Sequence, residues 1–189
     1  MGLGFPGGPA VAKAAAEATA PFRDLPRPMK GRPDCNFSFS GLKTALRQRV
    51  DALRADNAFD DATRANLAAG FQAAVVDCLI DRTSRALETA KAEHPDLSAL
   101  VVAGGVAANQ HLRAQLQKLA AKHGVRVLKD RSKPKNELIA EAKRLGRFIL
   151  VASQGFWTGV DLPNLLALVG IDKAPLPTPD DPVATGLRE

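Results

Sequence analysis

The feature that most constrains the fold is a mostly apolar run, Leu97–Ala103, that ends in the glycine pair Gly104-Gly105. A short run of this kind between turn signals predicts a strand that is buried on both faces. A helical pattern over Ala107–His123 and a second apolar run, Val125–Leu128, follow it. A strand, a tight glycine turn, a helix and a strand form a parallel βαβ unit, and such units bind ligands at the carboxyl ends of their strands. We therefore expect an α/β protein with Gly104-Gly105 at the ligand-binding edge.

Helix and strand signals flank this unit on both sides. They predict a helix from Pro9 to about Ala18, a short strand over Phe37–Phe39, a helix capped by Ser40 that runs to about Arg54, a long helix from about Asp60 to Glu93, a helix over Lys135–Leu145, and strands over Arg147–Ser153 and Leu165–Ile171. Four prolines then follow in a segment of low apolar content, so we expect the tail from about residue 174 to be loosely ordered.

Composition excludes several classes of protein. The 189 residues are 46% hydrophobic, yet no run of about 18 apolar residues occurs, and no basic segment precedes an apolar one at the N-terminus. We therefore expect a cytoplasmic protein with no membrane partner. Cys35 and Cys78 lie far apart and form no CxxC pair, which favours two free thiols over a disulfide or a zinc site.

The formal net charge of +6 allows an anionic partner such as RNA or DNA. The basic residues fall into two clusters: the first is Arg23, Arg27, Lys30, Arg32, Lys43, Arg47, Arg49 and Arg54, and the second is Lys129, Arg131, Lys133, Lys135, Lys143, Arg144 and Arg147. Either cluster can face phosphates, or it can simply be a solvated surface, because no aromatic residues are interleaved for base stacking. The charge pattern leaves both interpretations open.

Metal and nucleophile motifs are absent from the sequence. The histidines are His94, His111 and His123, and no two of them are four residues apart as a helical HxxxH site requires. No GxSxG serine elbow occurs. We expect no catalytic residue and no metal ligand in this chain.

The turn after the buried strand is the best candidate for binding a small molecule. Gly104 and Gly105 let a nucleotide approach the backbone, and Asn109 stands near the start of the next helix, where an amide can reach a ribose or a base edge. The alternative is that the two glycines only allow the strand and the helix to pack closely. The spacing does not decide between these interpretations.

Five motifs, in order and at the right spacing, closely resemble the C-terminal part of the TsaD family of tRNA adenosine threonylcarbamoyltransferases, over residues 3 to about 128. They are Leu3-Gly4-Phe5-Pro6-Gly7-Gly8-Pro9, Phe22-Arg23 with Pro26-Arg27-Pro28-Met29, Phe37-Ser38-Phe39-Ser40-Gly41-Leu42-Lys43-Thr44, Phe71-Gln72-Ala73-Ala74-Val75-Val76-Asp77, and Val102-Ala103-Gly104-Gly105-Val106-Ala107-Ala108-Asn109. The resemblance implies a partial actin-like lobe of the ASKHA, ribonuclease H-like type over residues 1–128.

The same resemblance implies a function and a set of site residues. The family transfers threonylcarbamoyl from an adenylate to the tRNA adenosine beside the anticodon, together with TsaB-like and TsaE-like partners. Asn109 matches the asparagine that contacts the adenylate, and Gly104 and Gly105 match the loop that lines the nucleotide pocket. The family also binds one metal ion, but its HxxxH and aspartate ligands have no counterpart in these residues. We therefore expect no cofactor, weak adenylate binding at most, and no transfer by this chain alone.

Residues 129–189 resemble a different family. Leu150–Pro163, Leu168–Pro177 and Pro179–Pro182 are similar to the second motor domain of DinG-like ATP-dependent helicases, with Phe156–Pro163 as their FWxGVDxP motif. The chain thus reads as an incomplete TsaD-like lobe joined to a partial helicase-type α/β segment. The helicase-like strands either extend the first sheet or stay poorly packed. The alternatives for function are a DinG-like helicase fragment, which strand-stimulated ATP hydrolysis would identify, and a non-enzymatic chimeric product.

Overall fold

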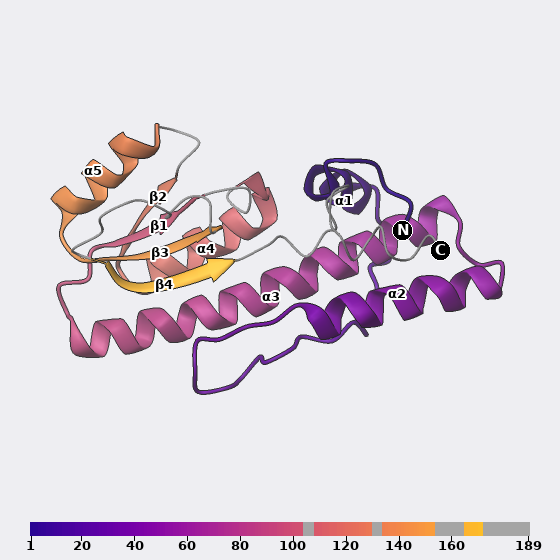
Figure 1. The fold of residues 1–189 in the computed structure, drawn as a ribbon, viewed down its shortest axis with the longest axis horizontal. Helices are drawn as coiled ribbons and strands as arrows, with labels where there is room; N and C mark the ends of the chain where they lie inside the picture. The colour runs from indigo at the N-terminus through magenta and orange to yellow at the C-terminus, as the bar shows by residue number, and fades with distance from the viewer. Residues whose placement is uncertain (104–107, 130–133, 154–164, 172–189) are drawn as a thin grey trace, which may run out of the picture. The chain divides into compact units, whose positions relative to one another are not determined.

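A computed structural model describes residues 1–103, 108–129, 134–153 and 165–171 (Figure 1). Gly104, Gly105, the whole FWxGVDxP motif (Phe156–Pro163) and the tail from about residue 174 lie outside this range. The described chain forms two compact units, which we call the helical unit, residues 1–29 and 37–78, and the sheet unit, residues 30–36 and 79–171. Within the described ranges, every helix is too short or too polar to cross a bilayer.

The helical unit consists of α1 (Gly7–Ala16), α2 (Ser40–Ala55) and the first part of α3 (Asp61–Glu93). Its buried residues recur at helical spacing, such as Leu42 and Val50 on α2 and Leu67 and Phe71 on α3. Asp60 accepts a hydrogen bond of 2.7 Å from the Thr63 amide and so satisfies a free N–H group at the start of α3. Apolar periodicity and a polar N-terminal residue thus explain the long helix that the sequence predicts.

Residue Asn66 of α3 binds the segment that follows α1. Its side-chain oxygen accepts hydrogen bonds from the amides of Thr19 and Ala20, at 3.0 and 2.8 Å. Its backbone carbonyl accepts a third from the amide of Phe22, at 3.2 Å. One helical turn later comes Gly70, whose missing side chain leaves room for the Phe22 carbonyl. The segment can therefore lie directly against the helix backbone.

The sheet unit contains four parallel strands in the order β2-β1-β3-β4. They are β1 (Ala99–Val102), β2 (Arg126–Lys129), β3 (Phe148–Ser153) and β4 (Leu165–Ile171), joined in part by α4 (Gln110–Lys122) and α5 (Lys135–Leu145). The order confirms the predicted parallel βαβ unit. It also shows that β3 and β4, the strands after residue 129, extend the sheet by pairing with β1 and with each other.

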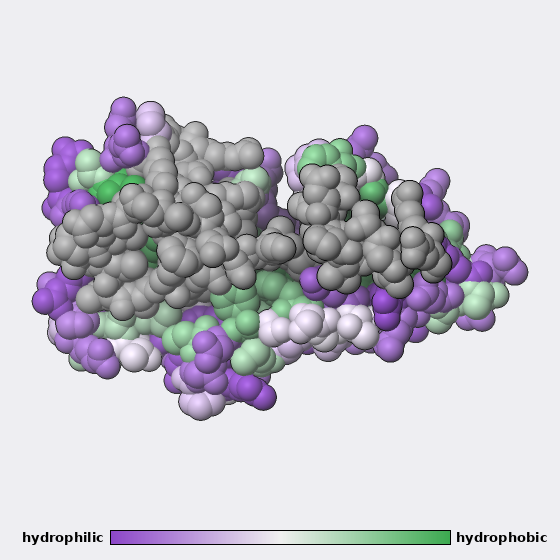
Figure 2. Space-filling model, in the orientation of Figure 1, coloured by the Kyte–Doolittle hydropathy of each residue, from purple (hydrophilic) through white to green (hydrophobic). Residues whose placement is uncertain are grey.

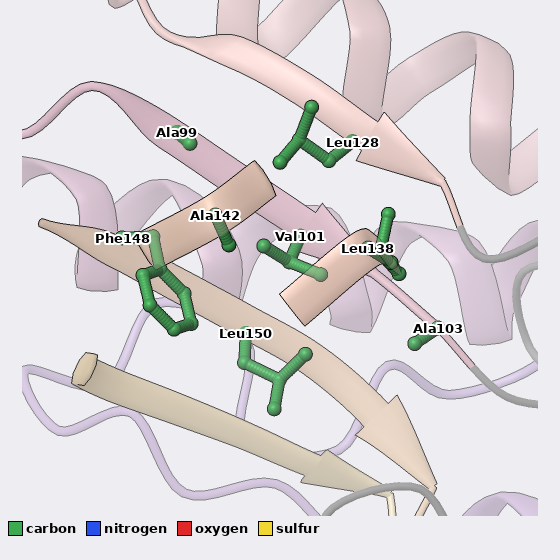
Figure 3. Close-up of a cluster of buried hydrophobic side chains, with 8 residues drawn as sticks. All are labelled: Ala99, Val101, Ala103, Leu128, Leu138, Ala142, Phe148 and Leu150. Carbon is green, nitrogen blue, oxygen red and sulfur yellow. The ribbon is translucent and has the colours of Figure 1, made fainter. Parts of the chain in front are cut away.

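One face of this sheet packs against α5. The apolar cluster there has members from β1, β2, α5 and β3, namely Ala99, Val101, Ala103, Leu128, Leu138, Ala142, Phe148 and Leu150 (Figure 3). The alternate residues, such as Leu100 and Ile149, are also buried, as strands covered on both faces require. Figure 2 shows hydrophilic residues over the outer side of α5, around a small apolar patch. The continuous apolar runs of β1 and β3 follow from this double burial.

The predicted strand over Phe37–Phe39 is wrong, because these residues form no strand. The two rings lie 5.5 Å apart between centroids, and Phe39, rather than Ser40, occupies the N-cap position of α2. The Ser38 hydroxyl accepts a hydrogen bond of 3.4 Å from the Ser40 amide, a local contact that competes with strand pairing. The proposed change of origin at residue 128 concerns descent and stays a prediction.

Gly70→Ala should destabilise the protein, because the new Cβ would lie 2.3 Å from the Phe22 carbonyl oxygen. We expect a loss of about 1–3 kcal/mol in the free energy of unfolding, measured by urea denaturation. The matched control is Gly41→Ala, also in a helix, where the nearest atom to the new Cβ is 3.7 Å away. That control should be neutral or gain up to about 1 kcal/mol from helix propensity. Equal losses in both variants would contradict the close approach at Gly70.

Candidate functional site

The candidate site lies at the carboxyl end of β1. At this strand the strand order reverses, because successive connections leave on opposite sides of β1. From β1 the chain crosses to β2 on one side, and from β2 it returns past β1 to β3 on the other side. Connections that diverge in this way leave a crevice outside the strand ends, and open α/β sheets bind their ligands there. The amide of Ala103 donates a 2.9 Å hydrogen bond to the Val151 carbonyl, so β1 and β3 stay paired up to this edge.

Asn109 is the described member of the predicted site, and it caps α4. Its side-chain Oδ1 accepts a hydrogen bond of 2.9 Å from the Leu112 amide, and its backbone carbonyl accepts one of 3.0 Å from the Arg113 amide. The residue is half-buried. The first turn of α4 contains no acidic residue, so the positive end of the helix dipole is not offset by a neighbouring carboxylate there. Asn109 is therefore the helix cap of α4, and its contact with a ligand stays a prediction.

Gly104 and Gly105 lie between β1 and Asn109 in the sequence but outside the described residues. Of the flanking residues, Ala103 directly follows β1 and Asn109 caps α4, the helix between β1 and β2. The assignment of all three site residues to a nucleotide stays a prediction.

The first basic cluster is partly neutralised. The Nε of Arg27 lies 3.0 Å from an Asp77 carboxylate oxygen, and an Nη of Arg49 lies 3.4 Å from one of Asp24. In the second cluster, Arg147 forms an ion pair of 3.4 Å with Asp96 and contacts His94. Some basic side chains of both clusters are therefore paired with carboxylates, so fewer of them are available to an anionic partner than the two clusters contain.

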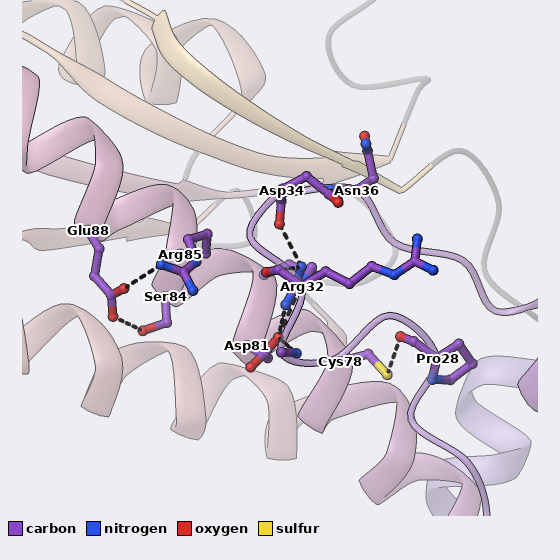
Figure 4. Close-up of polar contacts among 11 residues, drawn as sticks. Pro28, Arg32, Asp34, Asn36, Cys78, Asp81, Ser84, Arg85 and Glu88 are labelled. Carbon is purple, nitrogen blue, oxygen red and sulfur yellow. Dashed lines mark hydrogen bonds and ion pairs between the residues drawn. The ribbon is translucent and has the colours of Figure 1, made fainter.

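A buried network around Arg82 was not predicted from the sequence. Arg82 is only 2% exposed, and its guanidinium donates to the carbonyls of Arg32 and Asp34, at 3.1 and 2.6 Å. It also donates to the carboxylate of Asp81, which accepts a 3.0 Å hydrogen bond from the Gly31 amide (Figure 4). These contacts hold residues 31–34 against α3. The signal in the sequence is that Arg82 stands on the apolar stripe of α3, three residues after Leu79 and five before Leu87.

The network changes the proton affinity of Asp81. Burial raises the pKa of this carboxyl, but hydrogen bonds from Arg82 and Gly31 and the positive charges of Arg82 and Lys30 outweigh it, so the pKa lies below its ordinary value. The ionised carboxylate is thus the form that the folded chain favours.

Metal-binding groups are not gathered at this edge. In the part of the chain that the structure describes, no three His, Cys, Asp or Glu side chains are placed to hold an ion together. Cys35 is exposed and Cys78 is buried, and neither forms a disulfide within the described ranges. The Cys78 thiol lies 3.7 Å from the Pro28 carbonyl (Figure 4).

A small parallel sheet with helices packed on it defines an α/β protein. Comparison with known proteins identifies the family to which this chain belongs. The family model "TsaD: tRNA N6-adenosine threonylcarbamoyltransferase" matches residues 1–136, and the chain belongs to this family.

Curated relatives agree with the family match. Proteins named tRNA N6-adenosine threonylcarbamoyltransferase share 51% identity over 126 residues in Brucella anthropi, 48% over 128 residues in Gluconobacter oxydans and 51% over 131 residues in Maricaulis maris. These alignments cover 66%, 66% and 68% of this chain and 34% of each relative. The chain therefore spans about a third of the length of these relatives.

Asn109→Ala should cost about 1 kcal/mol of stability, because the Leu112 amide loses its acceptor. Thermal or urea unfolding measures this loss. Asn109→Asp keeps an oxygen at the cap and places a negative charge at the helix N-terminus, so it should retain the stability. Equal destabilisation by both variants would show that Asn109 does not stabilise the protein through its cap hydrogen bond.

Asp81→Asn should flatten the dependence of stability on pH. An Asp has a pKa of about 3.9 when unfolded, and a lower folded pKa adds stability that is complete above that value and is lost as the pH falls toward the folded pKa. We expect the wild-type chain to lose more stability than Asp81→Asn between about pH 5 and pH 3, measured by urea unfolding. Parallel curves for the two proteins would contradict the lowered pKa.

Proposed function

We propose that these 189 residues form the adenosine-side wall of a tRNA threonylcarbamoyl transferase. In this proposal residues 1–128 are a partial actin-like lobe, and the carboxyl end of β1 faces a threonylcarbamoyl adenylate. Asn109 contacts the adenylate, and Gly104 and Gly105 line the nucleotide pocket. The observation that supports this most is the family match over residues 1–136, a range that includes all three residues.

The transfer reaction needs groups that the described residues of this chain do not supply. The tRNA adenosine attacks the carbamoyl carbon and the adenylate phosphate leaves, so the site must position the carbamoyl group and stabilise the negative charge that develops. In the family that this chain resembles, a metal ion and a first lobe hold that end of the substrate. The described residues do not supply a matching donor set, so no step of the proposal uses a metal. We infer that this chain alone does not catalyse the transfer.

The proposal includes the partners of the family. These partners are tRNA, which accepts the threonylcarbamoyl group, and TsaB-like and TsaE-like proteins. We also propose a cytoplasmic location. The +6 net charge is compatible with an RNA partner. For residues 129–189 we propose descent from a DinG-like helicase, which the FWxGVDxP motif supports. In that segment β3 and β4 pair in parallel, as strands of α/β proteins commonly do.

Calorimetric titration of the chain with AMP and with a stable threonylcarbamoyl adenylate analogue tests the proposal. With most phosphate-side contacts missing, we expect a Kd no better than about 1 mM, which corresponds to ~4 kcal/mol. Asn109→Ala should abolish this binding. Asn109→Asp retains the cap but loses the amide donor, so weaker binding by Asn109→Asp at full stability would assign the effect to adenylate contact.

Two outcomes would contradict the proposal. Micromolar binding that depends on Asn109 would mean that the chain completes its own site, and the inference of inactivity would be wrong. ATP hydrolysis stimulated by single-stranded DNA would instead identify a working helicase fragment.

A further inference from the structure

A hollow of about 360 Å³ lies in the helical unit, where α2 ends and α3 begins. Its lining residues are Met1, Gly2, Arg54, Asn57, Phe59 and Arg64. Two arginines and no carboxylate are among them. The hollow belongs to the helical unit and shares no residue with the edge that carries Asn109.

The two arginines lie over the same aromatic ring. The guanidinium carbons of Arg54 and Arg64 are each 5.3 Å from the centroid of Phe59, which is half-buried. Cation–π attraction orients both side chains, while their like charges repel each other. Arg64 also pairs with Asp61, whose side chain is 93% exposed, so solvent weakens that pair. An anion that reached both guanidiniums would relieve the repulsion, and planar guanidinium groups suit phosphate oxygens.

A basic stripe on α2 leads to this hollow. Lys43, Arg47 and Arg54 are separated by four and seven residues, so they lie near one line along the helix, and all three are exposed. By the rise of 1.5 Å per residue the stripe is about 16 Å long. Among the described residues, no ion pair joins Lys43, Arg47 or Arg54 to a carboxylate, in contrast to Arg27 and Arg49.

Acidic residues near the hollow weaken its attraction for any anion, so an anion with several phosphates along the basic stripe is favoured over a single small one. Asp51 and Asp56 are exposed on or next to α2, and Asp60 caps α3 through its 2.7 Å hydrogen bond from Thr63. These carboxylates reduce the attraction for one free phosphate. A nucleic acid strand gains from every phosphate that meets a cation and from the counterions that each contact releases.

We propose that the Arg54–Phe59–Arg64 hollow and the stripe of Lys43, Arg47 and Arg54 hold successive phosphates of an RNA backbone. The choice of RNA rests on the proposed function, in which tRNA is the acceptor, whereas the phosphate contacts rest on the geometry of the helical unit. These contacts position the strand and carry no sequence preference. The surface shares no residue with the edge that carries Asn109, so each proposal can fail without the other.

Fluorescence anisotropy with a labelled, unmodified tRNA transcript tests the proposal. Arg54→Gln and Arg64→Gln should each weaken binding about fivefold at ~0.1 M salt. Each should also lower the slope of log K against log salt by about one. Arg54→Lys should recover the slope, because it restores the charge.

The matched control is Arg49→Gln. Arg49 is also on α2, lies 5.1 Å from the ring centroid of Phe22 and pairs with Asp24, but it does not line the hollow. We expect its binding to stay within about twofold of wild type. Thermal unfolding of each variant separates loss of binding from loss of fold, and AMP binding should be unchanged in Arg54→Gln.

Three results would overturn the proposal. One is an equal loss of binding in Arg49→Gln. Another is displacement of the tRNA by millimolar inorganic phosphate with the same dependence on Arg54, which would identify a site for a small anion. The last is equally tight binding of polyglutamate with the same variant pattern, which would identify a surface for an acidic protein. Adenylate binding that is unchanged in the Asn109 variants, with tRNA binding intact, would refute only the function proposed above.

Discussion

The pairing of β1 with a parallel strand on each side is the constraint on which the sheet unit depends. β1 has only four residues, yet all are buried, and its neighbours β2 and β3 satisfy its backbone groups on both edges. A buried strand without such partners would leave several polar groups without hydrogen bonds, at a cost of about 1–3 kcal/mol each. The covering helix α5, the apolar cluster beneath it and the position of Asn109 all follow from the placement of this strand.

The residues of the sheet unit show why much of its fold is predictable. The unbroken apolar runs of β1 and β3 could be recognised because both faces of each strand are buried, and burial on two faces leaves no alternation of polar residues. The bounds of α5 and β4 agree with their predicted bounds, since helical periodicity and a clear apolar run define each of them. By contrast, Phe37–Phe39 has strand-like alternation but no strand, because alternation alone does not supply a pairing partner.

The sequence predicts where the candidate site lies but does not predict the contacts of its residues. The βαβ pattern and Gly104-Gly105 predict a site at the end of β1, and the structure shows Asn109 at the start of α4, the helix between β1 and β2. The pattern did not show that Asn109 caps α4, because the sequence placed the start of that helix three residues earlier than the structure does. Arg82 was missed for a related reason: a single cation within an apolar stripe is read as part of a solvated face unless the carbonyls that it binds are known.

The order of strands in the sheet has a consequence for how this chain is made. β1 pairs on one edge with β3, and Ala99 is separated from its partner Phe148 by two helices and another strand. Contacts between such distant residues close long loops and slow the search for the native state. During synthesis from the N-terminus, β1 keeps one open edge until the ribosome has released β3. An arrest of translation before residue 148 would therefore leave a nascent chain whose central strand is exposed to aggregation along that edge.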